Sequence, residues 1–145
     1  QDGRGVASDE IEAVRWYRKA AEQGDAVAQN NLGAMYKKGQ GVTQDYTQAI
    51  HWHRKAAEQG NAIAQNNLAV MYSEGQGVVK DQAEAVRWYR KAAEQGVPES
   101  QFALGMAYED GEGITRNTKQ AVRWYREAAK QGNADAKDAL KRLGK

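Results

Sequence analysis

The chain of 145 residues contains no cysteine and one proline, and its 21 basic and 19 acidic side chains nearly cancel. Without cysteine, disulfide bonds and thiol chemistry are excluded. A net charge of +2 gives no general electrostatic basis for binding nucleic acid, which requires clustering of one sign of charge. No apolar run approaches the roughly 20 residues that span a membrane. We therefore expect neither a nucleic-acid partner nor membrane insertion.

One phrase dominates what the sequence does contain. The segment VRWYRKAAEQG at 14–24 returns unchanged at 86–96, and near copies occupy 50–60 and 122–132. Tryptophan, alanine, glycine and leucine all recur at intervals of 36 residues: Trp16, Trp52, Trp88 and Trp124; Ala20, Ala56, Ala92 and Ala128; Gly24, Gly60, Gly96 and Gly132; Leu32, Leu68, Leu104 and Leu140. Such self-similarity indicates an array of repeated supersecondary units.

Each period predicts two helices, which we call A and B. In the first full copy, the A helix lies within 25–39 and the B helix within 45–59, with Asp25 and Asp45 as N-caps. Gly39 and Gly60 are suited to end them, because glycine takes the left-handed conformation cheaply. No strand pattern is present. A single helical hairpin cannot bury its apolar face alone, so stacked copies must bury it against one another.

The sequence therefore predicts an all-α solenoid of stacked antiparallel helical hairpins with a 36-residue repeat. We expect one array over 1–145: a partial unit at 1–24, units at 25–60, 61–96 and 97–132, and a terminal capping helix at 133–145. Gly3 and Gly5 are in phase with the later G-x-G pairs, and Asp9 is in phase with the B-helix caps. We therefore expect the chain to be a fragment of a longer array, with any signal peptide upstream.

The pattern A…LGxxYxxGxGVxxDxxxAxxWYxKAAEQG resembles the Sel-one-like repeat, a relative of the tetratricopeptide repeat, over nearly the whole chain. The resemblance implies a right-handed solenoid and a non-catalytic scaffold or adaptor that binds a protein or peptide. It also suggests a bacterial source, in which case a periplasmic or secreted location is favoured. The compartment and the partner's identity stay open.

Features that could carry chemistry have structural explanations. The G-x-G pairs follow helices and recur in each unit, whereas a dinucleotide site needs a strand before the glycines. His51 and His53 are two residues apart, so they do not share a helix face as an i, i+4 metal pair does. Arg18, Arg54 and Arg90 each precede a glutamate by four residues, which predicts solvated ion pairs. We expect no catalytic residue, metal, cofactor or small-molecule substrate.

Partner binding is expected where the copies differ. By analogy with tetratricopeptide arrays, the A helices line the concave face, and their variable positions are the candidates for partner binding. These are Asn30, Asn31, Lys37, Lys38, Asn66, Asn67, Val70, Glu74, Glu99, Phe102, Met106, Glu109 and Asp110. The four asparagines form a possible amide ladder that can donate to and accept from a peptide backbone. The lysines and acidic residues form a charge gradient that would orient a partner, while Val70, Phe102 and Met106 are apolar anchors.

Two alternatives remain open at this stage. The array could be a regulatory or targeting module of a larger enzyme or cell-envelope protein, for example one that acts on cell-wall glycan through a fused domain. It could also be a spacer that binds no ligand. Flanking sequence would distinguish the first alternative, and a broad binding screen would distinguish the second.

Overall fold

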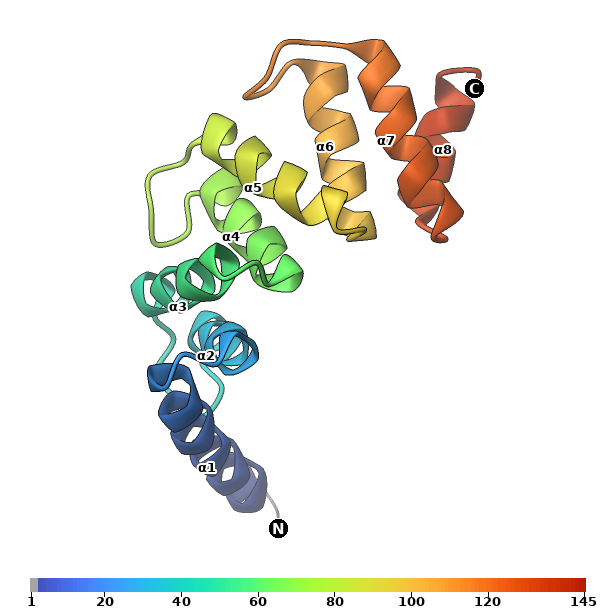
Figure 1. The fold of residues 1–145 in the computed structure, drawn as a ribbon. Coiled ribbons are helices and arrows are strands. Elements are labelled where there is room, and N and C mark those ends of the chain that lie inside the picture. The colour runs from blue at the N-terminus through green and yellow to red at the C-terminus, as the bar shows by residue number, and fades with distance from the viewer. Residues whose placement is uncertain (1–2) are drawn as a thin grey trace.

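The computed structural model describes the backbone of residues 3–145 and the side chains from residue 8 onward. Over residues 3–145 the chain forms eight α-helices and no strand. They are α1 (Gly3–Glu22), α2 (Ala26–Lys38), α3 (Tyr46–Glu58), α4 (Ala62–Glu74), α5 (Gln82–Glu94), α6 (Pro98–Asp110), α7 (Thr118–Lys130) and α8 (Ala134–Arg142). The helices follow one another along an arc, with the two termini at its opposite ends (Figure 1).

The all-α solenoid expected from the sequence is confirmed. The A helices are α2, α4, α6 and α8, and the B helices are α1, α3, α5 and α7. Each helix packs chiefly against its neighbours in sequence, as expected for stacked hairpins.

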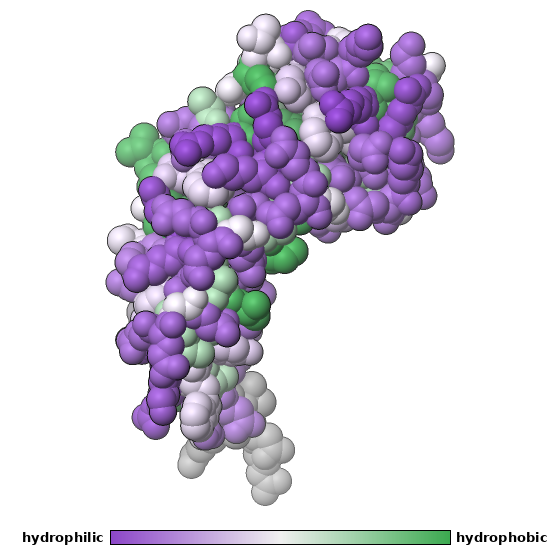
Figure 2. All heavy atoms as spheres, in the orientation of Figure 1, coloured by the Kyte–Doolittle hydropathy of each residue, from purple (hydrophilic) through white to green (hydrophobic). Residues whose placement is uncertain are grey.

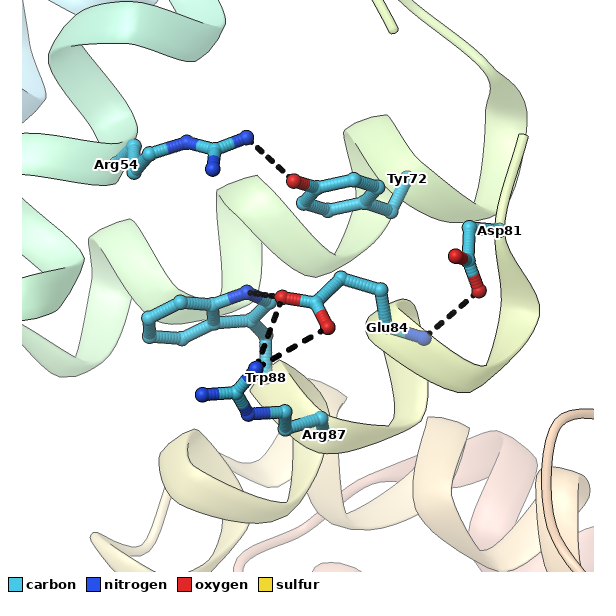
Figure 3. Close-up of polar contacts among 6 residues, drawn as sticks. All are labelled: Arg54, Tyr72, Asp81, Glu84, Arg87 and Trp88. Atoms are coloured by element: carbon cyan, nitrogen blue, oxygen red, sulfur yellow. Dashed lines mark hydrogen bonds and ion pairs between the residues drawn. The ribbon is translucent and has the colours of Figure 1, made fainter. Parts of the chain in front are cut away.

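The helix ends follow the sequence signals. Asp25 and Asn61 accept hydrogen bonds from the backbone N–H three residues later, at 2.7 and 2.9 Å. Asp81 caps α5 in the same way, through the N–H of Glu84 (Figure 3). Val97 cannot cap, and Pro98 follows it in the first turn of α6. These caps satisfy N–H groups that would otherwise lack partners.

The second glycine of each G-x-G pair is required for packing. Gly41, Gly77 and Gly113 have positive φ values of 67°, 69° and 69°. A Cβ on Gly77 would lie 2.4 Å from the carbonyl oxygen of Tyr46, at the start of the preceding B helix. The loop backbone thus rests directly on the preceding copy, as a structural contact and not a phosphate cradle.

Gly3, Gly5 and Asp9 do not take the loop and N-cap positions that their phase with the later copies predicts. All three lie within α1, so the first glycine pair forms no loop and Asp9 caps no helix. The later G-x-G loops rest on the B helix of a preceding copy. Helix is therefore the local alternative, because its hydrogen bonds need no neighbouring unit.

Glutamines form a second repeated contact between copies, which the sequence reasoning missed. Buried Gln65 of α4 donates from Nε2 to the carbonyl oxygen of Ala57, at the end of α3, at 3.2 Å. Its Oε1 accepts from Nε2 of Gln95, just after α5 in the same copy, at 2.8 Å. The same two bonds recur around Gln29 with Gln59 and around Gln101 with Gln131. The recurrence of these glutamines every 36 residues was the available signal.

The predicted Arg–Glu ion pairs do not form among the described side chains. Instead, Arg18 donates to the hydroxyl of Tyr36 at 2.6 Å, and Arg90 donates to that of Tyr108 at 3.1 Å. Arg54 makes the equivalent bond to Tyr72 (Figure 3). Each arginine lies on a B helix and each tyrosine on the following A helix, so these bonds join consecutive helices. An exposed Arg–Glu pair gains little stability, because water solvates both charges. The arginine can therefore bond the tyrosine hydroxyl instead.

The tryptophans fill the junctions between copies. Trp52, Trp88 and Trp124 are only 9, 5 and 9% exposed. Trp52 shares a core cluster with Val14 of α1 and Leu32 of α2, so its indole belongs to the contact with the preceding copy. Trp16 of α1 is 64% exposed, so its indole is not part of a buried junction.

This difference gives a paired stability test. Trp88→Ala should lower the free energy of unfolding by about 3–5 kcal/mol, because it leaves a large cavity between copies. Trp16→Ala should lower it by less than about 1 kcal/mol, because most of that side chain is already in water. Urea denaturation followed by far-ultraviolet circular dichroism measures both. Equal losses of unfolding free energy in the two variants would contradict the conclusion that the buried indoles stabilise the junctions between copies.

Candidate functional site

The thirteen candidate residues lie on α2, α4 and α6, and none is fully buried. Lys38, Glu74, Glu99, Met106 and Asp110 are exposed, and the other eight are half-buried. Hydrophilic residues cover most of the surface in view, with smaller hydrophobic areas between them (Figure 2). The A helices thus place all thirteen side chains at or near the surface.

The asparagines cross-link the A helices. Asn67 of α4 donates from Nδ2 to Oδ1 of Asn30 on α2, at 3.0 Å. Asn66 accepts at Oδ1 from the hydroxyl of buried Ser100 on α6, at 2.7 Å. No hydrogen bond of the Asn31 side chain occurs among the described residues. Asn30, Asn66 and Asn67 are therefore partly used within the fold, while Asn31 keeps its full donor and acceptor capacity.

In each copy, one aromatic ring of the B helix lies beside the contact between that copy's A helix and the next A helix. His53, Tyr89 and Tyr125 occupy the same place in successive copies. A Cβ on Gly33 would meet the His53 ring at 3.0 Å, and a Cβ on Gly105 would meet the Tyr125 ring at 2.6 Å. Gly33 and Gly105 let the ring pack closely against the A helix. The far end of the ring then determines which polar or apolar group lies at the surface of that copy.

In the last copy, that place is filled. Tyr125 donates its hydroxyl to Oε2 of Glu109 at 2.6 Å, and Arg142 of α8 forms an ion pair with Glu109 at 2.7 Å. Hydrogen bonds from Arg142 and Tyr125 lower the pKa of Glu109. Phe102 packs on Tyr125, with ring centroids 5.6 Å apart. Glu109 and Phe102 thus help to hold the terminal helix in place.

In the middle copy, a small pocket of about 130 Å³ is lined by Ser73, Tyr89, Met106, Asp110 and others. Burial raises the pKa of Tyr89 to about 12, and the nearby charge of Glu74 adds to the rise, while a hydrogen bond with Ser73 opposes it. Tyr89 therefore contributes a neutral hydroxyl to a pocket that Asp110 and Glu112 also line.

In the first copy, histidine replaces the tyrosine and the pocket enlarges to about 450 Å³. Its lining is Ala34, Lys37, Lys38, Gln44, Tyr46, His53 and Asn67. His53 is 0% exposed, and its Nδ1 lies 3.0 Å from Oδ1 of Asn30. Among the side chains described, its Nε2 has no hydrogen-bond partner. Burial, followed by the charge of Lys37, lowers the pKa of His53 to about 4.

A larger depression of about 710 Å³ borders α7 and is lined by Val122, Arg126, Lys145 and others. In the preceding copy, the loop at Gly113 and Ile114 borders the equivalent surface of α5. This depression therefore corresponds to the surface of α5 that the loop of the following copy borders, and it differs in kind from the pockets at the A-helix junctions.

Among the described residues, no group of three or more histidine and acidic side chains could hold a metal ion. Over the same part of the chain, no helix is both long and apolar enough to cross a membrane.

The Sel1 repeat family model matches residues 1–25, 26–61, 62–97 and 98–133. The chain belongs to the Sel1 repeat family. Proteins of this family generally serve as protein-interaction modules, so the resemblance inferred from the sequence is confirmed. No match was found among curated proteins.

Solved Sel1 structures share the fold. The protective antigen c5321 of uropathogenic Escherichia coli, which displays an SLR fold, is 50% identical over 87% of this chain, with a TM-score of 0.85. A Sel1 repeat protein from Oxalobacter formigenes is 40% identical over 93%, with a TM-score of 0.81. Cysteine-rich protein B of Helicobacter pylori is 26% identical over 96%, with a TM-score of 0.73. This chain covers 27, 54 and 100% of those chains, respectively.

The buried histidine predicts a specific pH dependence of stability. Its pKa is about 4 in the folded chain and 6.5 ordinarily, so the unfolded chain binds the additional proton between these values. As pH falls from about 6.5 to 4, His53 should lower the free energy of unfolding by up to about 3 kcal/mol. His53→Tyr, which restores the residue of the other copies, should remove this loss.

Urea denaturation at pH values from 4 to 8 would measure the effect, with His51→Gln as the control because His51 is exposed. If the free energy of unfolding changes with pH in the same way for the original chain and for His53→Tyr, the conclusion that His53 is buried and neutral would be contradicted.

Proposed function

We propose that this Sel1 array is a non-catalytic scaffold that binds an extended peptide or protein segment along α2, α4 and α6. The observation that carries the proposal is the variation of surface residues between nearly identical copies. Lys37, Ser73 and Glu109 occupy one repeated position on these helices. Scaffold positions repeat because each must make the same contact, whereas a partner can select different residues at each copy.

Polar capacity on the same helices supports this binding mode. The Asn31 side chain makes no hydrogen bond within the described residues, and Asn67 uses one Nδ2 hydrogen on Asn30. A side-chain amide can both donate and accept, so these residues can pair with the two polar groups of a peptide unit. Met106, 40% exposed, offers an apolar contact two copies away from Asn31.

The test is selection from a random 12-residue peptide library on the immobilised chain, followed by affinity measurement with variants. Asn31→Ala combined with Asn67→Ala should weaken the selected peptides about tenfold or more, because two hydrogen bonds are lost. Glu58→Gln combined with Glu94→Gln changes exposed residues of B helices and should leave affinity unchanged.

Circular dichroism of both double variants controls for folding, because Asn67→Ala also removes the bond to Asn30. Equal affinities for the original chain and the asparagine variant would overturn binding along the A helices. An empty selection would favour a spacer without a ligand.

A further inference from the structure

We infer that the pocket formed by α2, α3 and α4 is a subsite for an acidic side chain of a peptide, whose carboxylate binds Lys37 and Lys38 while an adjacent N–H or O–H of the same peptide donates to Nε2 of His53. This inference rests on the proposed function and adds the chemical class of the bound segment and its position on the array.

The pocket lies where one copy departs from the repeat, with histidine in the place of tyrosine. The pockets of the first and middle copies share equivalent lining positions: Lys37 and Ser73, Tyr46 and Gln82, His53 and Tyr89, Asn67 and Ala103. Histidine is shorter than tyrosine and carries no hydroxyl at its far end. The volume rises from about 130 to about 450 Å³ between the two copies. In the last copy, Tyr125, Glu109 and Arg142 occupy the corresponding place.

The hydrogen bonds determine the state of the His53 ring. Oδ1 of Asn30 can only accept, and it receives Nδ2 of Asn67 while lying 3.0 Å from Nδ1 of His53. Nδ1 must therefore carry the proton and donate. In a neutral imidazole the other nitrogen, Nε2, is then an acceptor. This acceptor is buried and has no partner among the described side chains, and a buried acceptor left without a hydrogen bond destabilises the fold. It calls for a hydrogen-bond donor.

The charge of the pocket calls for an anion. None of its seven lining residues is acidic, and neither Lys37 nor Lys38 forms an ion pair within the described part of the chain. The equivalent residues of the middle copy are Ser73 and Glu74, so the two positive charges belong to this copy alone. Gln44 donates to the hydroxyl of Tyr46 at 3.3 Å and to the carbonyl oxygen of Lys37 at 2.8 Å, which orders the pocket's rim.

An acidic peptide fits both requirements better than a polyanion does. A phosphate group would place more negative charge beside the bare lone pair of Nε2. The next pocket along the helices is lined by Asp110 and Glu112, which would repel a continuous nucleic-acid backbone. A peptide supplies the carboxylate and a neighbouring donor from one residue or two, and its remainder can be uncharged. The charge gradient would fix its direction.

The probe for the test is the peptide acetyl-Gly-Glu-Asp-Glu-Gly-amide, with acetyl-Gly-Gln-Asn-Gln-Gly-amide as its uncharged counterpart. Titration into the nitrogen-15-labelled chain at pH 7 is followed by NMR. The acidic peptide should change the chemical shifts of the His53 ring and of the backbone amides of residues 34–38 and 44–46. The nitrogen-15 shift of Nε2 should change in the direction expected when this nitrogen accepts a hydrogen bond. The amide counterpart should bind at least tenfold more weakly.

Two variants and a matched control complete the design. Lys37→Gln with Lys38→Gln, and separately His53→Tyr, should each weaken the acidic peptide at least tenfold. His53→Tyr should fold, because tyrosine is the residue at this place in the other copies and Tyr125 packs against Gly105 as His53 packs against Gly33. Lys137→Gln with Lys141→Gln removes the same charge from exposed sites of α8 and should change affinity less than twofold.

Equal binding of the two peptides, or equal losses in both lysine variants, would overturn the subsite. Tighter binding of a phosphoserine peptide or a short RNA at this pocket would overturn its assignment to carboxylates. If the library-selected peptides bind but ignore Lys37 and Lys38, this inference fails while the proposed function stands. If those peptides also ignore Asn31 and Asn67, the proposed function fails as well.

Discussion

The burial of one tryptophan per copy against the preceding copy is the contact on which the array depends. An isolated hairpin of this size leaves its apolar stripe in water, and only a neighbour can cover it. Trp52 in α3 illustrates the requirement, because its cluster contains residues of both α1 and α2. The alanines allow the helices to approach closely, and the glutamine contacts satisfy polar groups at the same junctions.

Sequence reasoning predicts whatever is encoded locally or by repetition. The caps Asp25 and Asn61 and the 36-residue period follow from side-chain chemistry and spacing alone. Contacts set by a spatial neighbour were not predictable in the same way. Arg54 has a glutamate one turn away, yet it bonds Tyr72 of the next helix. Gly5 has a sequence context similar to that of Gly41, yet Gly5 is helical, whereas Gly41 lies in a loop against the backbone of Glu10 in α1.

The candidate site shows the same division. Comparing copies identified the variable positions of the A helices, but it could not separate residues that contact each other from residues left for a partner. Glu109 is engaged by Arg142 and Tyr125, and Phe102 packs on the Tyr125 ring. The replacement of tyrosine by His53 was visible in the sequence. Its consequence, an enlarged pocket beside Lys37, required knowledge of which A-helix residue lies next to the ring.

The geometry of the ring position explains how one fold can present different chemistry at each copy. The ring packs closely against a glycine of the A helix, Gly33 for His53 and Gly105 for Tyr125, so its inner part is held by the scaffold whether it is histidine or tyrosine. Only its outer end and the A-helix residue beside it vary. Tyrosine with Glu109 closes the place, tyrosine with Ser73 leaves a small pocket, and histidine with Lys37 leaves a larger basic one. Because the glycine contact at the inner part of the ring is the same for His53 and Tyr125, the surface chemistry can change through the outer end of the ring and one A-helix residue while the solenoid stays intact.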